Sequence, residues 1–158
     1  MKYKVVATGG TFDHIHAGHL ALLDKSFEVG DAVVIGVTSD AFAAQSGKTP
    51  DQPYVTRVEA LEDLLSSRYP GRQHMIAQLD DFFGPGIASP EIQAIVVTKE
   101  TAQRVPLANI MRTRKGYPPL EVVTIDFVMA EDKKPISSTR IRNGEIDPQG
   151  RLKRRKRG

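Results

Sequence analysis

Short apolar runs alternate along the chain with segments of helical periodicity, and this alternation restricts the possible folds more than any other feature. Strand-like runs occupy residues 2–8, 31–37, 74–79, 94–98 and 120–125. Helical segments occupy residues 17–29, 41–45, 54–69, 101–114 and 139–145. The strands are expected to be buried on both faces, as in parallel sheets. The pattern predicts an α/β fold, a doubly wound five-stranded parallel sheet with helices on both faces.

Ligands bind such sheets beyond the carboxyl ends of the strands, and here the stretch GGTFDHIHAGH occupies that place at residues 9–19. Gly9 and Gly10 allow the backbone to approach a phosphate closely, and Thr11 adds a hydroxyl donor. The helix that begins near residue 17 directs its positive end to the same region. An anion site is therefore predicted, although no Gly-Lys-Ser/Thr follows as in a Walker loop.

Three of the four histidines lie in this stretch, at His14, His16 and His19. His16 and His19 are three residues apart at a helix start, so their rings share one side of the first turn. Imidazoles placed there can donate to phosphate oxygens during nucleotidyl transfer, and Gly18 leaves room for a base or sugar. Two alternatives remain, a zinc site formed by the three histidines with Asp13 and histidines that merely occupy a surface helix start.

A second polar stretch, PISSTRIR, covers residues 135–142. Its hydroxyl groups precede a helix-like turn that carries Arg140 and Arg142. Hydroxyls and free N–H groups at a helix start bind phosphate, and arginines add forked donors. The alternative is an ordinary helix cap followed by two solvated arginines.

The charge of the chain is distributed unevenly. There are 22 basic and 19 acidic residues, but the final eight, RLKRRKRG, hold six of the basic ones. We expect a domain over residues 1–150 and a disordered basic tail over 151–158, with an arm that binds nucleic acid or a membrane surface as the alternative. The absence of cysteine excludes disulfides and thiolate metal sites and fits a cytoplasmic protein. No apolar run is long enough to span a membrane.

Taken together, the two polar stretches resemble the nucleotidyltransferases that share an HxGH motif and a later ISSTxxR-type motif. The block AEDKKPISSTRIRNGEID is similar to the archaeal phosphopantetheine adenylyltransferases in particular, and the resemblance covers roughly residues 3–147. It implies a Rossmann-like nucleotidyltransferase fold. It also implies a cytoplasmic enzyme of coenzyme A biosynthesis, which transfers adenylyl from ATP to 4′-phosphopantetheine and yields dephospho-coenzyme A and pyrophosphate.

The resemblance also implies roles for individual residues. His16, His19 and Thr11 would be catalytic, with Thr11 between the α-phosphate and the incoming phosphate. Lys48 and Arg57, together with Thr11, would bind the phosphopantetheine phosphate. The implied ATP-binding residues are Gly9, Gly10, Thr11, His16, Gly18, His19, Ser137, Ser138, Thr139 and Arg142. Mg²⁺ would be held mainly by ATP phosphates and water, so no protein ligand for a metal is expected.

Two other functions are compatible with all or part of these motifs. One is a nucleotidyltransferase that uses CTP or ATP with another acceptor, such as glycerol 3-phosphate or nicotinamide mononucleotide. The other is a non-catalytic nucleotide- or RNA-binding protein that uses the basic tail, although binding alone gives no reason for the paired histidines. Neither a membrane nor a nucleic acid is the expected partner, and the sequence predicts no oligomeric state.

Overall fold

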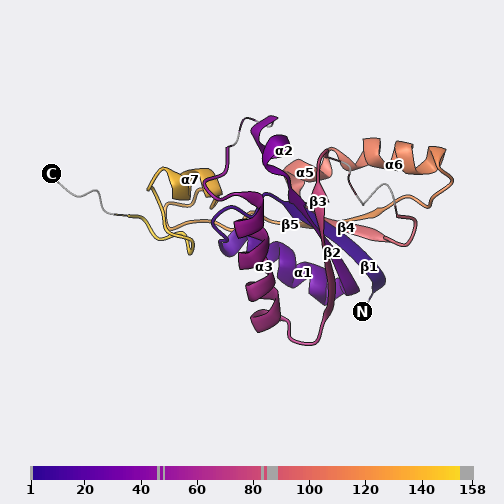
Figure 1. Ribbon diagram of the computed structural model, residues 1–158, viewed down its shortest axis with the longest axis horizontal. Coiled ribbons are helices and arrows are strands. Elements are labelled where there is room, and N and C mark those ends of the chain that lie inside the picture. The colour runs from indigo at the N-terminus through magenta and orange to yellow at the C-terminus, as the bar shows by residue number, and fades with distance from the viewer. Residues whose placement is uncertain (1, 46, 48, 83, 85–88, 154–158) are drawn as a thin grey trace.

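A computed structural model describes residues 2–45, 47, 49–82, 84 and 89–153. It contains a five-stranded parallel sheet with the strand order β3-β2-β1-β4-β5 (Figure 1). The strands are β1 (Tyr3–Gly10), β2 (Gly30–Thr38), β3 (Gln73–Leu79), β4 (Ala94–Thr98) and β5 (Glu121–Ile125). The predicted fold class is confirmed, and each predicted strand is present within about two residues of its expected limits.

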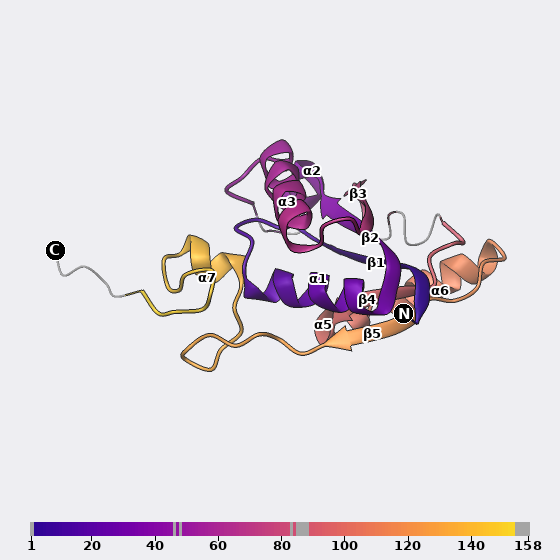
Figure 2. The same cartoon turned by 90° about the horizontal axis from the view of Figure 1, so that it is seen from below.

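Helices cover both faces of the sheet, as the two perpendicular views show (Figures 1 and 2). The helices are α1 (Ala17–Val29), α2 (Asp40–Gln45), α3 (Tyr54–Arg68), α5 (Lys99–Ala102), α6 (Val105–Arg114) and α7 (Ser138–Arg142). Helices α1 and α3 lie on one face, and α5 and α6 lie on the other. The order of the strands places the reversal of winding between β1 and β4, where doubly wound sheets form a crevice.

The main core lies between the sheet and the pair α1 and α3. Leu23 and Phe27 of α1 and Leu61 and Leu65 of α3 are fully or almost fully buried there. These positions recur at helical spacing, so one stripe of each helix is apolar. The opposite face has a smaller cluster around Ala7, Val34, Ile92 and Leu120, and this thinner packing leaves space for a cavity.

The single helix predicted from Thr101 to Arg114 is wrong, because the structure has two helices there, α5 and α6. Pro106 lies at the start of α6. It has no N–H to donate to the preceding turn, and its ring collides with the carbonyl four residues earlier, so a helix cannot continue through it.

After β5 the chain leaves the sheet and forms a small core of its own. Its buried residues are Ala130, Ile136, Ile141 and Ile146. The amide of Ala17, at the start of α1, donates to the carbonyl of Pro148 at 3.0 Å and attaches this segment to the body. Figure 2 shows α7 just beyond the N-terminal end of α1.

The sequence predicts a domain that ends at residue 150. Contacts with the body continue slightly further, since Leu152 forms a bridge with Ile146 and the Lys153 amide donates to the Glu145 carbonyl at 3.0 Å. The rest of the basic tail, residues 154–158, lies outside the described residues. Among the helices that are described, none combines the length and apolar character needed to cross a membrane.

Candidate active site

A cavity opens at the carboxyl ends of β1 and β4, next to α1 and α7. Its wall includes Gly9, Gly10, Thr11, His16, Gly18, His19, Ser137, Ser138, Thr139 and Arg142. All ten residues that the sequence nominated for ATP therefore meet around one space, although the two motifs are more than 100 residues apart. Gly9 and Gly10 are the last residues of β1 and pair with Gly36 and Val37 of β2, so the turn itself begins at Thr11.

The two motif histidines cap the start of α1. The Gly18 amide donates to Nδ1 of His16 at 3.0 Å, and the His16 amide donates to Nδ1 of His19 at 3.1 Å. The two rings are stacked with their centroids 3.8 Å apart. Because Nδ1 accepts a hydrogen bond in both rings, a neutral imidazole carries its proton on Nε2. Each histidine of the cavity wall therefore has an N–H donor to offer a ligand.

Gly18 is required by the ring of His16. A Cβ at position 18 would lie 2.8 Å from Cε1 of His16, a contact that would displace the ring. The sequence suggested that Gly18 makes room for a base or sugar. The structure shows that Gly18 makes room for the imidazole that caps the helix, which explains why a glycine lies between the two motif histidines.

Burial keeps both imidazoles neutral in the protein without ligand. Burial lowers the pKa of His16 to about 4. Burial and the neighbouring His16 lower the pKa of His19 to about 3, against a smaller opposite effect of Asp13. Near pH 7 the pair therefore offers neutral N–H donors to an incoming ligand and carries no fixed positive charge beforehand.

These depressed pKa values predict that acid destabilises the fold. In the unfolded chain a histidine has a pKa of about 6.5. Between that pH and about pH 4 the unfolded chain takes up protons on these two rings that the folded protein does not, so the free energy of unfolding decreases as the pH falls. Urea unfolding between pH 7 and pH 4 will measure the slope, which should be smaller in His19→Asn. An equal slope in both proteins would show that His19 does not cause the loss of stability in acid.

The opposite wall of the cavity comes from residues 137–142. Ser137 caps α7, and its Oγ accepts from the Arg140 amide at 3.2 Å. Oγ of Ser138 donates to the carbonyl of Asp13 at 2.5 Å, and Arg142 donates from Nη2 to Oγ1 of Thr139 at 3.2 Å. The hydroxyls of Ser137 and Thr139 accept in these contacts, so their own protons remain available to a ligand. Arg140 is turned away and pairs with Asp132 and Glu145.

A second cavity lies on the other side of the same turn, on the face of the sheet opposite α1. Its wall is mostly apolar and includes Ala7, Val34, Phe42, Leu79, Phe82, Ile95 and Val97. Gly9, Gly10, Thr11 and Thr101 line both cavities. Sequence reasoning missed this cavity, because its apolar residues come from separate strands and loops and form no local pattern. Lys48, predicted to bind the acceptor phosphate, lies outside the described residues.

Arg57 does not have the position expected of a phosphate ligand, and its predicted role is corrected here. Its side chain is fully buried. Its guanidinium donates to the carbonyls of Thr11 at 2.7 Å and Gln52 at 3.0 Å and to the carboxylate of Asp40 at 2.8 Å. Arg57 therefore supports the turn that separates the two cavities, and it lines neither of them.

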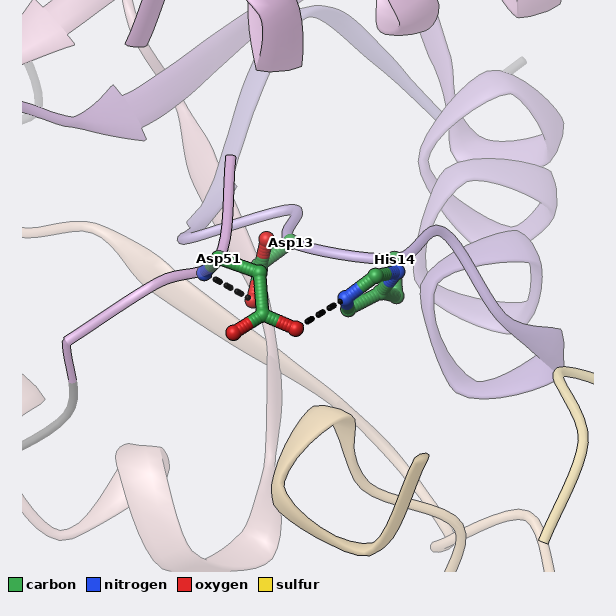
Figure 3. A group of neighbouring side chains, drawn as sticks. All are labelled: Asp13, His14 and Asp51. Carbon is green, nitrogen blue, oxygen red and sulfur yellow. Dashed lines mark hydrogen bonds and ion pairs between the residues drawn. The ribbon is translucent and has the colours of Figure 1, made fainter. Parts of the chain in front are cut away.

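Possible metal ligands gather beside the first cavity. In the described part of the chain, ligand atoms of Asp13, His14 and Asp51 lie within 4.8 Å of one another (Figure 3). His16 and His19 do not belong to this group, so the zinc site considered from the sequence has no support in the arrangement. Oδ2 of Asp13 already accepts from the Asp51 amide at 3.1 Å and from Arg142 at 2.7 Å. A cation here would be repelled by that guanidinium, and we assign no metal.

Comparison with known proteins agrees with this geometry. A cytidylyltransferase-like family model matches residues 7–144, which include both motifs. The fold and the paired motifs thus define a nucleotidyltransferase. The chain is 45% identical over 157 residues to the phosphopantetheine adenylyltransferase of Methanothermobacter thermautotrophicus, with 99% of this chain and 94% of the relative covered. It is 43% identical over 151 residues to the enzyme of the same name from Methanosarcina acetivorans, with 94% and 96% covered.

The chain belongs to the phosphopantetheine adenylyltransferase family. Among solved structures, it is similar to an Archaeoglobus fulgidus protein described as having unknown function. The TM-score is 0.69 and the identity 28%, and the match covers 78% of this chain and 89% of that protein.

Proposed function

We propose that the chain transfers the adenylyl group of ATP to the phosphate of 4′-phosphopantetheine, with dephospho-coenzyme A and pyrophosphate as products. The observation that carries the proposal is the first cavity, whose wall combines residues of the stretches 9–19 and 137–142. Its donors suit a triphosphate, and the adjoining apolar cavity suits the largely uncharged pantetheine arm. The names of the relatives support the same reaction.

The reaction needs positioning and charge neutralisation more than acid–base chemistry. An oxygen of the acceptor phosphate attacks the α-phosphorus of ATP, a new P–O bond forms, and the bond to the β-phosphate oxygen breaks. Its electron pair leaves with pyrophosphate. Because a phosphate monoester is largely a dianion near pH 7, it is already a nucleophile. The obstacle is repulsion between two polyanions, which donors around the cavity reduce.

Each group of residues has a distinct task in this reaction. Thr11 lies where the two cavities meet, so its hydroxyl can contact the phosphates that react. Oγ1 of Thr38 lies 3.2 Å from Oγ1 of Thr11; with Thr38 as the donor, the proton of Thr11 is directed to the substrates. The Nε2–H groups of His16 and His19 donate to the α- and β-phosphates, and the side chains from α7 hold the outer phosphates.

Mg²⁺ is expected on the triphosphate, and the donor set is compatible with it. Among the described residues that line the first cavity, Asp126 is the one that carries a carboxylate. This carboxylate pairs with Lys99 at 3.1 Å. Hydroxyl, imidazole and guanidinium groups make up the other polar side chains. Such a wall suits a cation that is bound by phosphate oxygens and water. When bound, the ion neutralises part of the triphosphate charge.

The test is a direct assay of purified protein with a panel of acceptors and nucleotides. Pyrophosphate release with ATP should be fastest with 4′-phosphopantetheine, and mass spectrometry should identify dephospho-coenzyme A. Glycerol 3-phosphate, nicotinamide mononucleotide and CTP serve as competing substrates. Faster turnover with any of these would assign the cavity to another acceptor or nucleotide within the wider class of nucleotidyltransferases.

Lys48→Ala is expected to raise the KM for 4′-phosphopantetheine by about tenfold or more and to leave the KM for ATP nearly unchanged. A lysine that binds the acceptor phosphate contributes a charge-assisted hydrogen bond to that substrate alone. Initial rates at varied concentrations of each substrate will measure both constants. Lys25→Ala, which removes a surface lysine paired with Glu28 on α1, is the matched control. Equal changes in both KM values would contradict the role of Lys48 as a ligand of the acceptor phosphate.

A further inference from the structure

Asp13 lies in an unusual turn between the two motif residues Thr11 and His16. The residues on either side of it have left-handed backbones, with φ of 55° at Phe12 and 49° at His14. Residues other than glycine rarely adopt this conformation, and it persists only where surrounding contacts hold it. The turn directs the side chain of Asp13 inward, where it is fully buried.

The buried carboxylate joins three parts of the chain. Oδ1 accepts from the Gln52 amide at 3.1 Å, and Oδ2 accepts from the Asp51 amide at 3.1 Å and from Nη1 of Arg142 at 2.7 Å. The carbonyl of Asp13 accepts from Ser138 as well. Figure 3 shows that Asp51 contacts both other residues, with its amide directed to Asp13 and its carboxylate directed to the His14 ring.

The bond to Asp13 restrains the guanidinium of Arg142 at the edge of the first cavity. Nη1 is held by Asp13 and Nη2 by Thr139, so both ends of the fork are anchored. An arginine has five N–H donors in a rigid plane, and Arg142 lines the cavity. The remaining N–H donors of Arg142 are therefore presented to a ligand in a defined orientation.

The carboxylate remains charged in spite of its burial. Burial opposes ionisation of Asp13, but hydrogen bonds from the Asp51 amide, Arg142 and the Gln52 amide outweigh it and lower the pKa of the carboxyl. Arg142 thus keeps an anionic partner at neutral pH, and hydrogen bonds between charged groups are stronger than those between neutral ones.

We propose that Asp13 is a positioning residue for the outer phosphates of the nucleotide. Its carboxylate fixes the guanidinium of Arg142 on the α7 side of the cavity, which the proposed function assigns to the outer phosphates. The fixed guanidinium thereby makes the site prefer a nucleoside triphosphate over a nucleoside monophosphate. The inference rests on the proposed function for the nucleotide site, but it does not depend on the identity of the acceptor.

Calorimetric titrations with ATP and with AMP, at constant Mg²⁺ and without acceptor, test the proposal. The ratio of the two dissociation constants is the readout. Asp13→Asn should reduce the preference for ATP over AMP by about 10- to 100-fold, the effect of losing one charged hydrogen bond, mainly through weaker ATP binding. If Asp13 has a purely structural role, both nucleotides bind less tightly and the ratio is unchanged, which would overturn the proposal. Tighter ATP binding would overturn it too, because the carboxylate would then withhold Arg142 from the ligand.

Two further variants keep the experiment decisive. Asp126→Asn also removes a negative charge from the cavity wall, but Asp126 pairs with Lys99 and not with Arg142, so the preference for ATP should not decrease. A decrease equal to that of Asp13→Asn would show that the effect does not depend on the contact with Arg142 and would overturn the proposal. Arg142→Lys retains the charge and loses the fork. If Asp13→Asn does not fold, a normal ATP preference in Arg142→Lys would overturn the proposal by itself. If the protein does not transfer adenylyl to 4′-phosphopantetheine, the proposed function is contradicted. The ratio of the dissociation constants for ATP and AMP can still be measured, because the titrations contain no acceptor.

Discussion

His19→Ala is expected to lower kcat by about 10²–10³-fold and to change the dissociation constant for ATP only slightly. His19 is almost fully buried, and its Nε2–H is directed by the bond between Nδ1 and the His16 amide. A donor held in this way stabilises charge that builds up on the phosphates in the transition state, and it costs no reorganisation at that moment. Single-turnover rates and calorimetry with ATP will separate the two constants.

Two related substitutions separate the tasks of the two ring nitrogens. Asparagine at position 19 can still accept from the His16 amide through its side-chain oxygen, but it lacks a group in place of Nε2. Glutamine reaches further and can offer an N–H there. We therefore expect His19→Asn to keep the fold and to show the low kcat of His19→Ala, and His19→Gln to recover part of the activity. Normal turnover of His19→Asn would show that the residue only caps α1.

The second large effect is expected for Arg57→Leu, which should lower the free energy of unfolding by about 2 to 5 kcal/mol through the loss of donors to two backbone carbonyls. The guanidinium of Arg57 is fully buried, and the substitution leaves the carbonyls of Thr11 and Gln52 without these donors. Because Thr11 lines both cavities, activity should decrease for ATP and for the acceptor together. Urea unfolding and steady-state kinetics will measure the two effects.

Arg68→Leu is the matched control for Arg57→Leu. Arg68 lies on the same helix, α3, and also pairs with an aspartate, Asp24, but the two side chains are 41% and 47% exposed. Exposed ion pairs contribute little to stability, so the loss should stay below about 1 kcal/mol. If Arg57→Leu were as stable as this control and raised only the KM for 4′-phosphopantetheine, Arg57 would contact the acceptor after all.

Much of the fold and the location of the site could be predicted from local patterns. Continuous apolar runs such as Val33–Val34–Ile35 indicated buried strands, and their spacing by helices indicated a parallel sheet. Since the carboxyl ends of parallel strands meet at one edge, the loop after the first strand was a predictable site. A serine cap for the last helix was also visible in the sequence, because a serine before a short helical turn is a common cap; the structure selects Ser137 over Ser138.

The roles of the charged residues inside the molecule could not be predicted in the same way. Asp13 was considered only as a possible zinc ligand, and its partner Arg142 is 129 residues away. Arg57 looked like a phosphate ligand, yet its donors face carbonyls of the turn. In both cases hydrogen-bond partners of the buried charged side chain come from segments that are distant in the sequence, so they depend on which segments pack together.

The sequence by itself determined the order of strands and helices, the edge of the sheet at which the site forms, and the residue types that gather there. Periodicity and helix caps are local properties, and a chain of this length can satisfy them with few alternative folds. Only the tertiary structure decided the proton position on each imidazole, the partner of each buried charge and the shape of the apolar cavity. These depend on contacts between distant segments, and a buried charge or polar group takes its function from the partner that compensates its burial.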